Sequence, residues 1–182
     1  MITDIRLAGQ QLAAPRFDTP KKLVSWMGAI QAQDYAMARW AVGIRLKSAT
    51  ARSVGEAFSR GEILRTHVMR PTWHLVAAED IRWMLKLSAR RIRSANESLA
   101  KGRQLELTEQ LHYRCDRLLE KMLEGNRNLT KQQIGEELNR QGIAADTPRL
   151  TRLLMRAETE AVVCSGPFSG GKQTYALLEE RV

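Results

Sequence analysis

The sequence has 182 residues, of which 43% are hydrophobic and 27% are charged, a balance that is typical of a folded globular protein and excludes an intrinsically disordered chain. The 29 Lys and Arg residues outnumber the 20 Asp and Glu residues and give a net charge of +9, which favours a polyanionic partner such as nucleic acid. A basic surface without a ligand is the alternative. Two cysteines, Cys115 and Cys164, exclude a disulfide framework and a metal site made of cysteines alone.

The sequence also predicts where the protein is found. No apolar stretch approaches the roughly 20 residues that span a bilayer. Met1 leads into a charged helix rather than a signal sequence. We therefore expect a cytoplasmic protein that associates with the bacterial nucleoid.

Four helices are predicted in the first 61 residues. Thr19 as an N-cap and Pro20 in the first turn begin the second helix, and apolar residues at spacings of three and four continue it to about Gln33. Gly61 ends the fourth helix. The predicted ranges are residues 2–12, 20–33, 35–47 and 53–60.

After Gly61 the pattern alternates over residues 62–69 and 72–77, which predicts a β-hairpin. A two-residue loop at either Arg70-Pro71 or Pro71-Thr72 places Arg65, His67 and His74 on one face of the hairpin, whereas a three-residue loop would separate the two histidines. Helices followed by a hairpin are the order of a winged-helix unit. We therefore predict a first domain over residues 1–77.

The remaining residues, 78–182, are predicted to form a linker helix over residues 79–101 followed by a second winged helix-turn-helix domain. The basic residues of the linker helix could contact phosphates, but a solvated helix face is the commoner role of such a pattern. A further helix over residues 108–124 carries an apolar stripe that includes Cys115, which we therefore predict to be buried rather than reactive.

The second domain has the clearest local pattern. Thr130 and Gln133 form a capping box, so a helix begins at Lys131 and ends near Gly142. Pro148 opens another helix, whose inner face carries Leu150, Leu153, Leu154 and Ala157. The predicted outward stripe of the same helix consists of Arg149, Arg152 and Arg156.

Two strands follow that helix, over residues 161–164 and 172–178, and complete a helix, turn, helix, hairpin order. The predicted fold class is therefore mainly α with small β-hairpins, arranged as a tandem winged helix-turn-helix. In such domains the helix carrying the arginine stripe enters the major groove, so we expect double-stranded DNA as the partner, with Lys172 as a further contact. The alternatives are that this helix packs against another domain, or that its arginines only increase the solubility of the protein.

The tripeptide Gln31-Ala32-Gln33 is the motif that bears on chemistry. Met27-Gly28-Ala29 precedes it, and the downstream segment Arg65-Thr-His-Val-Met-Arg-Pro-Thr-Trp-His-Leu-Val76 is followed by Glu79-Asp80. With this context, most of the chain resembles the winged-helix DNA glycosylases of the AlkZ and YcaQ type.

The resemblance implies tandem winged helices around a concave DNA-binding surface, and excision of alkylated purines or unhooking of interstrand crosslinks. It assigns catalysis to Gln31 and Gln33, which match the family's Gln, hydrophobic residue, Gln pattern. Gln33 would hold the attacking water, and Gln31 would support it or contact the sugar-phosphate; Asp34 is expected to cap a helix or form a salt bridge. Members of the family usually continue beyond the position of Val182, so the chain is expected to be the N-terminal portion of such an enzyme or a short paralogue.

The hairpin supplies further candidates for DNA contact: Arg65, His67, Arg70 and His74. As a metal pair the two histidines would need a third ligand, which the sequence does not supply, so we expect no metal and no cofactor. The alternative function is a non-enzymatic DNA-binding protein, such as a transcriptional regulator, that reads DNA through Arg149, Arg152 and Arg156.

Overall fold

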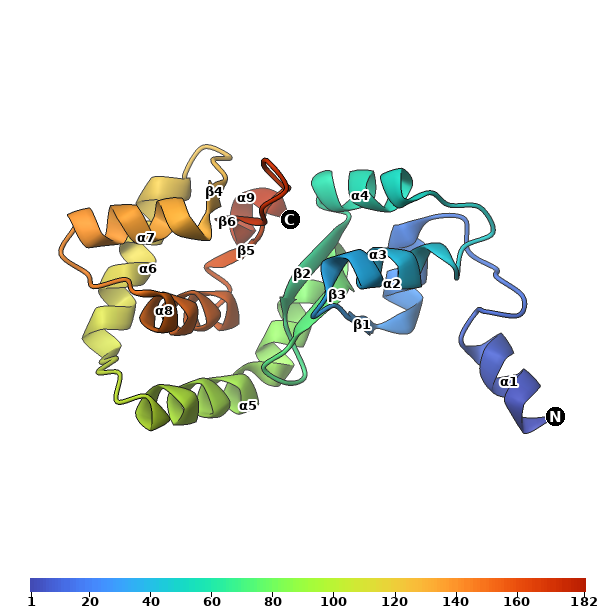
Figure 1. Ribbon diagram of the computed structural model, residues 1–182, viewed down its shortest axis with the longest axis horizontal. Helices are drawn as coiled ribbons and strands as arrows, with labels where there is room; N and C mark the ends of the chain where they lie inside the picture. The colour runs from blue at the N-terminus through green and yellow to red at the C-terminus, as the bar shows by residue number, and fades with distance from the viewer.

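The computed structural model describes residues 1–182 and consists of two units joined by a long helix (Figure 1). The N-terminal unit contains α2 (Pro20–Met27), β1 (Ala29–Gln31), α3 (Tyr35–Gly43), α4 (Ala51–Ser59), β2 (Ile63–His67) and β3 (Trp73–Ala77). It is preceded by α1 (Ile2–Gly9), which buries no residue and extends away from the rest of the molecule in Figure 1.

The C-terminal unit follows the connecting elements η1 (Ala78–Asp80) and α5 (Ile81–Gly102). It contains α6 (Glu109–Leu123), β4 (Leu129–Thr130), α7 (Lys131–Arg140), α8 (Thr147–Thr159), β5 (Val163–Ser165), β6 (Thr174–Leu177) and α9 (Leu178–Arg181). The predicted class, mainly α with small β-hairpins, is confirmed. None of the helices is both long enough and apolar enough to cross a lipid bilayer.

The two units share one order of elements: helix, strand, helix, helix, strand, strand. Each has a three-stranded antiparallel sheet with its last strand in the middle, in the orders β1-β3-β2 and β4-β6-β5. Each unit also has its own hydrophobic core. A third core cluster joins Leu64 and Val76 to Leu85 of α5 and to Cys164 and Leu178, so apolar packing continues across residue 77. The predicted domain division at that residue stays a prediction.

Several local predictions are confirmed. Thr130 accepts a hydrogen bond from the Gln133 amide while the Gln133 side chain accepts one from the Thr130 amide, so α7 begins at Lys131. Cys115 is buried in the core of the C-terminal unit. Burial raises the pKa of its thiol to about 12, which keeps it protonated and unreactive.

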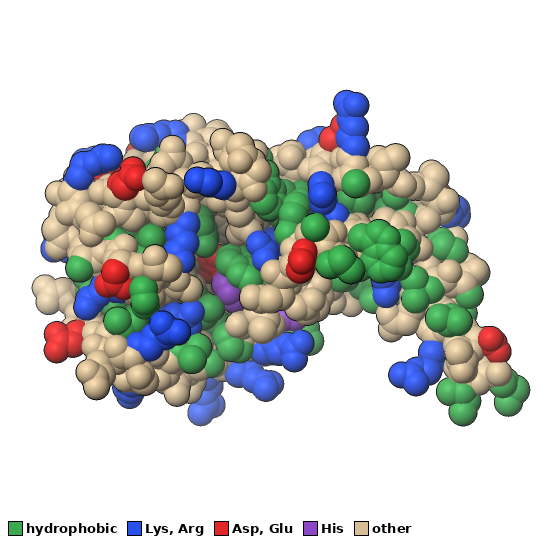
Figure 2. Space-filling view, in the orientation of Figure 1, with side chains coloured by type: hydrophobic (Ala, Val, Ile, Leu, Met, Phe, Trp, Pro, Cys, Tyr) green, Lys and Arg blue, Asp and Glu red, His purple; other side chains and the backbone are tan.

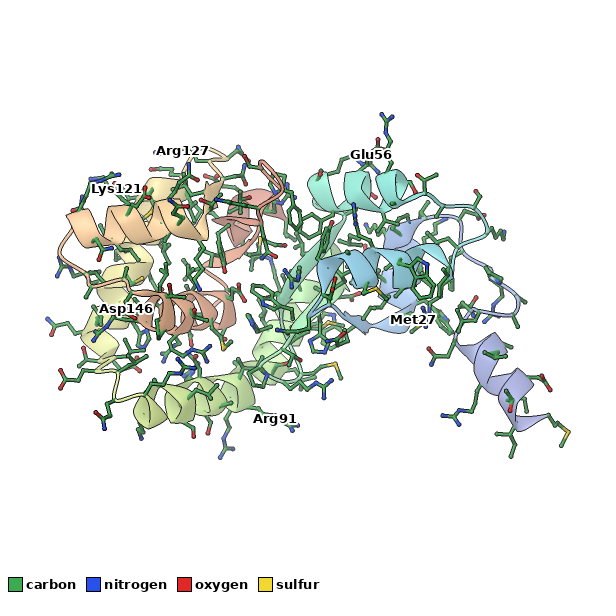
Figure 3. All side chains as sticks on the ribbon, viewed as in Figure 1. Met27, Glu56, Arg91, Lys121, Arg127 and Asp146 are labelled. Atoms are coloured by element: carbon green, nitrogen blue, oxygen red, sulfur yellow. The ribbon has the colours of Figure 1, made fainter.

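The predicted end of the second helix is wrong. Helix α2 stops at Met27, labelled in Figure 3, because Gly28 takes a left-handed φ of 74° and turns the chain into β1. Residues 29–31 then pair with β3, where Ile30 lies opposite Leu75. Ile30 fits the helical spacing of α2, but pairing with a strand far along the chain overrides that local preference.

The predicted hairpin is present, but its loop is longer than two residues. The last pair joins His67 to Trp73, so residues 68–72 form the connection. This register places His67 on one face of the sheet with Arg65 and Trp73, and places His74 on the opposite face. The predicted common face for the two histidines is therefore wrong.

Candidate active site and nucleic-acid interface

The Gln-Ala-Gln segment lies at the junction between β1 and α3. Gln31 is the last residue of the edge strand β1 and lies opposite His74. Ala32 is fully buried, and its amide donates a hydrogen bond to the Trp73 carbonyl at 2.8 Å. The two glutamines on either side of this anchored alanine are exposed.

The following residue fixes the other end of the segment. Asp34 is the N-cap of α3, and its Oδ1 accepts a hydrogen bond from the Met37 amide at 3.0 Å. The carboxylate therefore caps a helix, as expected from the sequence.

Arg65 on β2 holds the backbone of the motif. Its Nε donates to the Ala32 carbonyl at 2.9 Å and its Nη2 donates to the Gln33 carbonyl at 3.0 Å. Its Nη1 reaches across to Gln173 Oε1 of the C-terminal unit at 2.5 Å. The guanidinium also lies over the Trp73 ring, 4.6 Å from the ring centroid. Arg65 is thus a half-buried residue that connects the motif to the C-terminal unit.

A cleft of about 380 Å³ lies between the two units at this point. Figure 2 shows this face of the molecule hollowed between the units, with histidine side chains visible in the hollow. The N-terminal unit lines the cleft with Gln33, Arg65, His67 and Trp73, and the C-terminal unit lines it with Lys131, Arg152, Glu158 and Gln173. Gln31 is not among the lining residues, so the cleft brings together only one of the two predicted catalytic glutamines with Arg65.

Three cations of the cleft form no salt bridge with a carboxylate: Arg65, Lys131 and Arg152. Lys131 Nζ donates instead to Thr151 Oγ1 at 2.5 Å. Burial and the neighbouring Arg152 lower the pKa of Lys131, and burial together with Arg103 lowers the pKa of Arg152. Cations that are partly desolvated and close together favour binding of an anion, because its charge relieves their mutual repulsion. The Lys131 and Arg152 side of the cleft therefore favours an anion such as a phosphate group, and the Glu158 carboxylate belongs to the same lining.

Comparison with known proteins adds an independent observation. The family model described as "DNA glycosylase AlkZ-like" matches residues 24–182, which is most of the chain. The chain belongs to the AlkZ-like DNA glycosylase family.

One solved structure shows the same fold. The DNA glycosylase AlkZ of Streptomyces sahachiroi superposes with a TM-score of 0.74 at 22% sequence identity, over 95% of this chain and 47% of that one. The AlkZ-like chain thus spans about half the length of that protein. No curated protein matches the sequence.

The two histidines of the AlkZ-like chain are buried and serve different contacts. His67 is 5% exposed, and its Nδ1 lies 2.5 Å from Glu158 Oε2. His74 is 4% exposed and donates from Nδ1 to the Thr72 carbonyl at 2.8 Å, while burial lowers its pKa. Each ring thus uses its Nδ1 within the protein, and the phosphate contact expected from the sequence stays a prediction for both histidines. No three His, Cys, Asp or Glu side chains lie close enough together to hold a metal ion.

The remaining hairpin candidates lie at exposed positions. Arg70 is in the connection between β2 and β3, and Lys172 is in the tight turn between β5 and β6, where its backbone exchanges two hydrogen bonds with Ser169. Both side chains are on the protein surface, and their role in DNA contact stays a prediction.

The predicted outward arginine stripe of α8 is partly covered, since Arg156 is buried and Arg149 and Arg152 are half-buried. Helix α5 packs along α8, and Asn96 of α5 donates to the Arg152 carbonyl at 3.0 Å. Arg156 is only 8% exposed and donates to both carboxylate oxygens of Glu109. Arg149 donates to the Glu106 carbonyl at 3.1 Å. The three arginines therefore do not form a free outward row, because α5, α6 and the segment between them pack against α8, which the periodicity of α8 does not reveal.

The surroundings of Arg156 predict a pH dependence of stability. Burial raises the pKa of the half-buried Asp116 on α6 to about 6, and the neighbouring Arg156 guanidinium offsets this only in part. The pKa of Asp116 is thus higher in the folded state than in the unfolded chain. The protonated carboxyl therefore stabilises the fold at low pH, and this contribution is lost as pH rises through about 6.

We therefore expect Asp116→Asn to stabilise the fold at about pH 8 by about 1 kcal/mol, after allowance for solvent screening, and to have little effect at about pH 4. Urea unfolding at both pH values measures this difference. A variant as stable as the native protein at the higher pH would contradict the assignment.

Proposed function

We propose that this chain is a DNA glycosylase, or the N-terminal portion of one, that hydrolyses the N-glycosidic bond of alkylated purines or unhooks crosslinks in the double-stranded DNA of the bacterial nucleoid. The observation that carries the proposal is the cleft between the units. It places Gln33 beside Arg65, Lys131 and Arg152, three cations without carboxylate partners. Family membership supports the same reaction class.

The architecture that we propose for this function is a tandem winged helix-turn-helix. It is supported by the shared element order of the two units and by their sheets, in which the last strand lies between the other two. The proposed DNA-contacting surface is the cleft and the hairpin tips that carry Arg70 and Lys172, rather than the outer face of α8.

The proposed chemistry needs a placed water rather than a strong acid. An N7-alkylated purine carries positive charge, so the electrons of its bond to C1′ leave with the base, which becomes neutral. The water oxygen then bonds to the oxocarbenium-like C1′ and passes a proton to solvent.

Gln33 is the side chain that we assign to hold this water. Its Oε1 accepts a hydrogen bond from the Trp73 amide at 3.3 Å, which orients the side-chain amide. A carbonyl oxygen has a second lone pair and the amide nitrogen has two donors, so both atoms can still bind a water. Gln31, outside the cleft lining, is assigned to the sugar-phosphate next to the lesion.

No observation favours a transcriptional regulator as a second candidate. That hypothesis depended on Arg149, Arg152 and Arg156 facing solvent together, whereas Arg156 is buried and the other two are half-buried. Of the three arginines, Arg152 remains in the proposed interface because it lines the cleft.

Release of N7-methylguanine tests the proposal. The chain is incubated in excess over a duplex that contains a single N7-methylguanine, and abasic sites are revealed by alkaline cleavage. We expect cleavage at the modified position only. A chain that binds this duplex without generating abasic sites would instead support a DNA-binding role without catalysis.

A further inference from the structure

Glu158 on α8 is a fully buried carboxylate at the contact between the two units. Its Oε2 is paired with His67 Nδ1 at 2.5 Å, whereas its Oε1 is buried and accepts no hydrogen bond. No other carboxylate of α6 to α9 is paired with a basic side chain of the N-terminal unit. Buried pairs of this kind are often replaced by apolar residues without loss of stability, so stability alone does not account for this one.

The pair lies at one end of a short chain of contacts that ends at the motif. The His67 ring packs on the Trp73 ring with centroids 4.0 Å apart. The Trp73 amide donates to Gln33 Oε1 at 3.3 Å, and the Trp73 carbonyl accepts from the Ala32 amide at 2.8 Å. Two residues, His67 and Trp73, therefore separate Glu158 from the Gln33 side-chain amide, and the last link is the Trp73 backbone amide.

A second set of contacts reaches the motif from the same unit. Ser165 Oγ accepts a hydrogen bond from the Arg65 amide at 2.8 Å, and Gln173 Oε1 accepts one from the Arg65 guanidinium. Arg65 in turn binds the carbonyls of Ala32 and Gln33. The polar contacts that hold Ala32 and Gln33 thus come from Trp73 and Arg65, both of which are held in place by the C-terminal unit.

We propose that Glu158 is a positioning residue for the Gln-Ala-Gln motif, acting across the unit boundary through His67 and Trp73. The effect on catalysis rests on the proposed function, whereas the restraint on the Gln33 side chain does not. The carboxylate fixes the His67 ring, the ring fixes Trp73, and the Trp73 amide fixes the Gln33 side chain.

The test replaces the pair without removing the aromatic ring that packs on Trp73. The double variant Glu158→Leu, His67→Phe fills a similar volume with apolar side chains, which keeps the unit contact folded and removes only the polar restraint. Glu158→Gln retains a hydrogen-bond acceptor for His67. Thr159→Val is the matched control, because it removes a buried hydrogen bond from the next residue of α8, to the Met155 carbonyl, without touching the chain of contacts.

The first readout needs no catalysis. The backbone amide resonance of Trp73 reports its hydrogen bond to Gln33, and Gln33→Ala gives the position of that resonance when the bond is absent. We expect the double variant to move the resonance toward that position, and Glu158→Gln and Thr159→Val to leave it in place. An unmoved resonance in a folded double variant would overturn the proposal.

The second readout separates binding from reaction. We expect the double variant to lower the single-turnover rate of base release by about tenfold with DNA affinity within about twofold, because a displaced water-holding group acts in the transition state. Glu158→Gln should recover most of the rate. If the native chain is active and the double variant is equally active, the positioning role of Glu158 is overturned and the glycosylase proposal is unaffected. A native chain that releases no base would overturn the glycosylase proposal, and the Trp73 resonance would then decide the positioning role.

Discussion

Gln33→Ala is expected to lower the single-turnover rate of N7-methylguanine release by about tenfold to a hundredfold while DNA affinity stays nearly unchanged. The reason is that a side-chain amide that orients water stabilises the transition state and adds little to ground-state binding. Measuring the rate with enzyme in excess, and the Kd by fluorescence anisotropy on the same duplex, separates the two effects.

Gln31 provides the internal comparison for this experiment. Because Gln31 does not line the cleft, Gln31→Ala should reduce the rate less than Gln33→Ala does. Gln33→Glu keeps the size and the acceptor oxygens but adds a negative charge, so it should retain part of the rate while weakening DNA binding. Undiminished base release by the double variant Gln31→Ala, Gln33→Ala would exclude both residues from catalysis.

Lys131→Ala combined with Arg152→Ala is expected to weaken binding to duplex DNA by about tenfold and to reduce the slope of log affinity against log salt concentration by about two units. Both side chains line the cleft, and neither has a carboxylate partner that would neutralise it. Titrations at several salt concentrations measure the slope directly.

A control with the same change in net charge is available on α5. Arg90 and Arg91 are exposed, and Figure 3 shows Arg91 pointing away from the two units. Replacing this pair by alanine should alter the salt slope much less than replacing Lys131 and Arg152. Equal effects of the two double variants would mean that DNA attraction depends on net charge and not on the cleft.

The features predicted correctly from sequence are those encoded within a few residues. The capping box of Thr130 and Gln133, the apolar face of α8 that includes Leu150, and the buried Cys115 each depend on local spacing. The Gln-Ala-Gln motif was found through resemblance, because the tripeptide alone is common in helices.

The features that sequence did not predict depend on distant parts of the chain. The end of α2 depends on pairing of residues 29–31 with β3, and the faces of the two histidines depend on a loop whose length the alternating pattern leaves open. The burial of Arg156 depends on α5 and α6, and arginine at regular spacing looks the same whether it faces water or a second helix. Lys131, in the first turn of α7, is a cleft residue that only the approach of the two units reveals.

The approach of β2 to β5 has a consequence for aggregation. Each of these strands is the outer strand of its sheet, with one row of backbone groups unpaired by its own sheet. The two strands lie against each other, and the Arg65 amide of β2 is satisfied by the Ser165 hydroxyl of β5. Exposed strand edges are templates for pairing with other chains. Each unit thus shields one edge of the other's sheet, and either unit expressed alone would expose that edge to its copies.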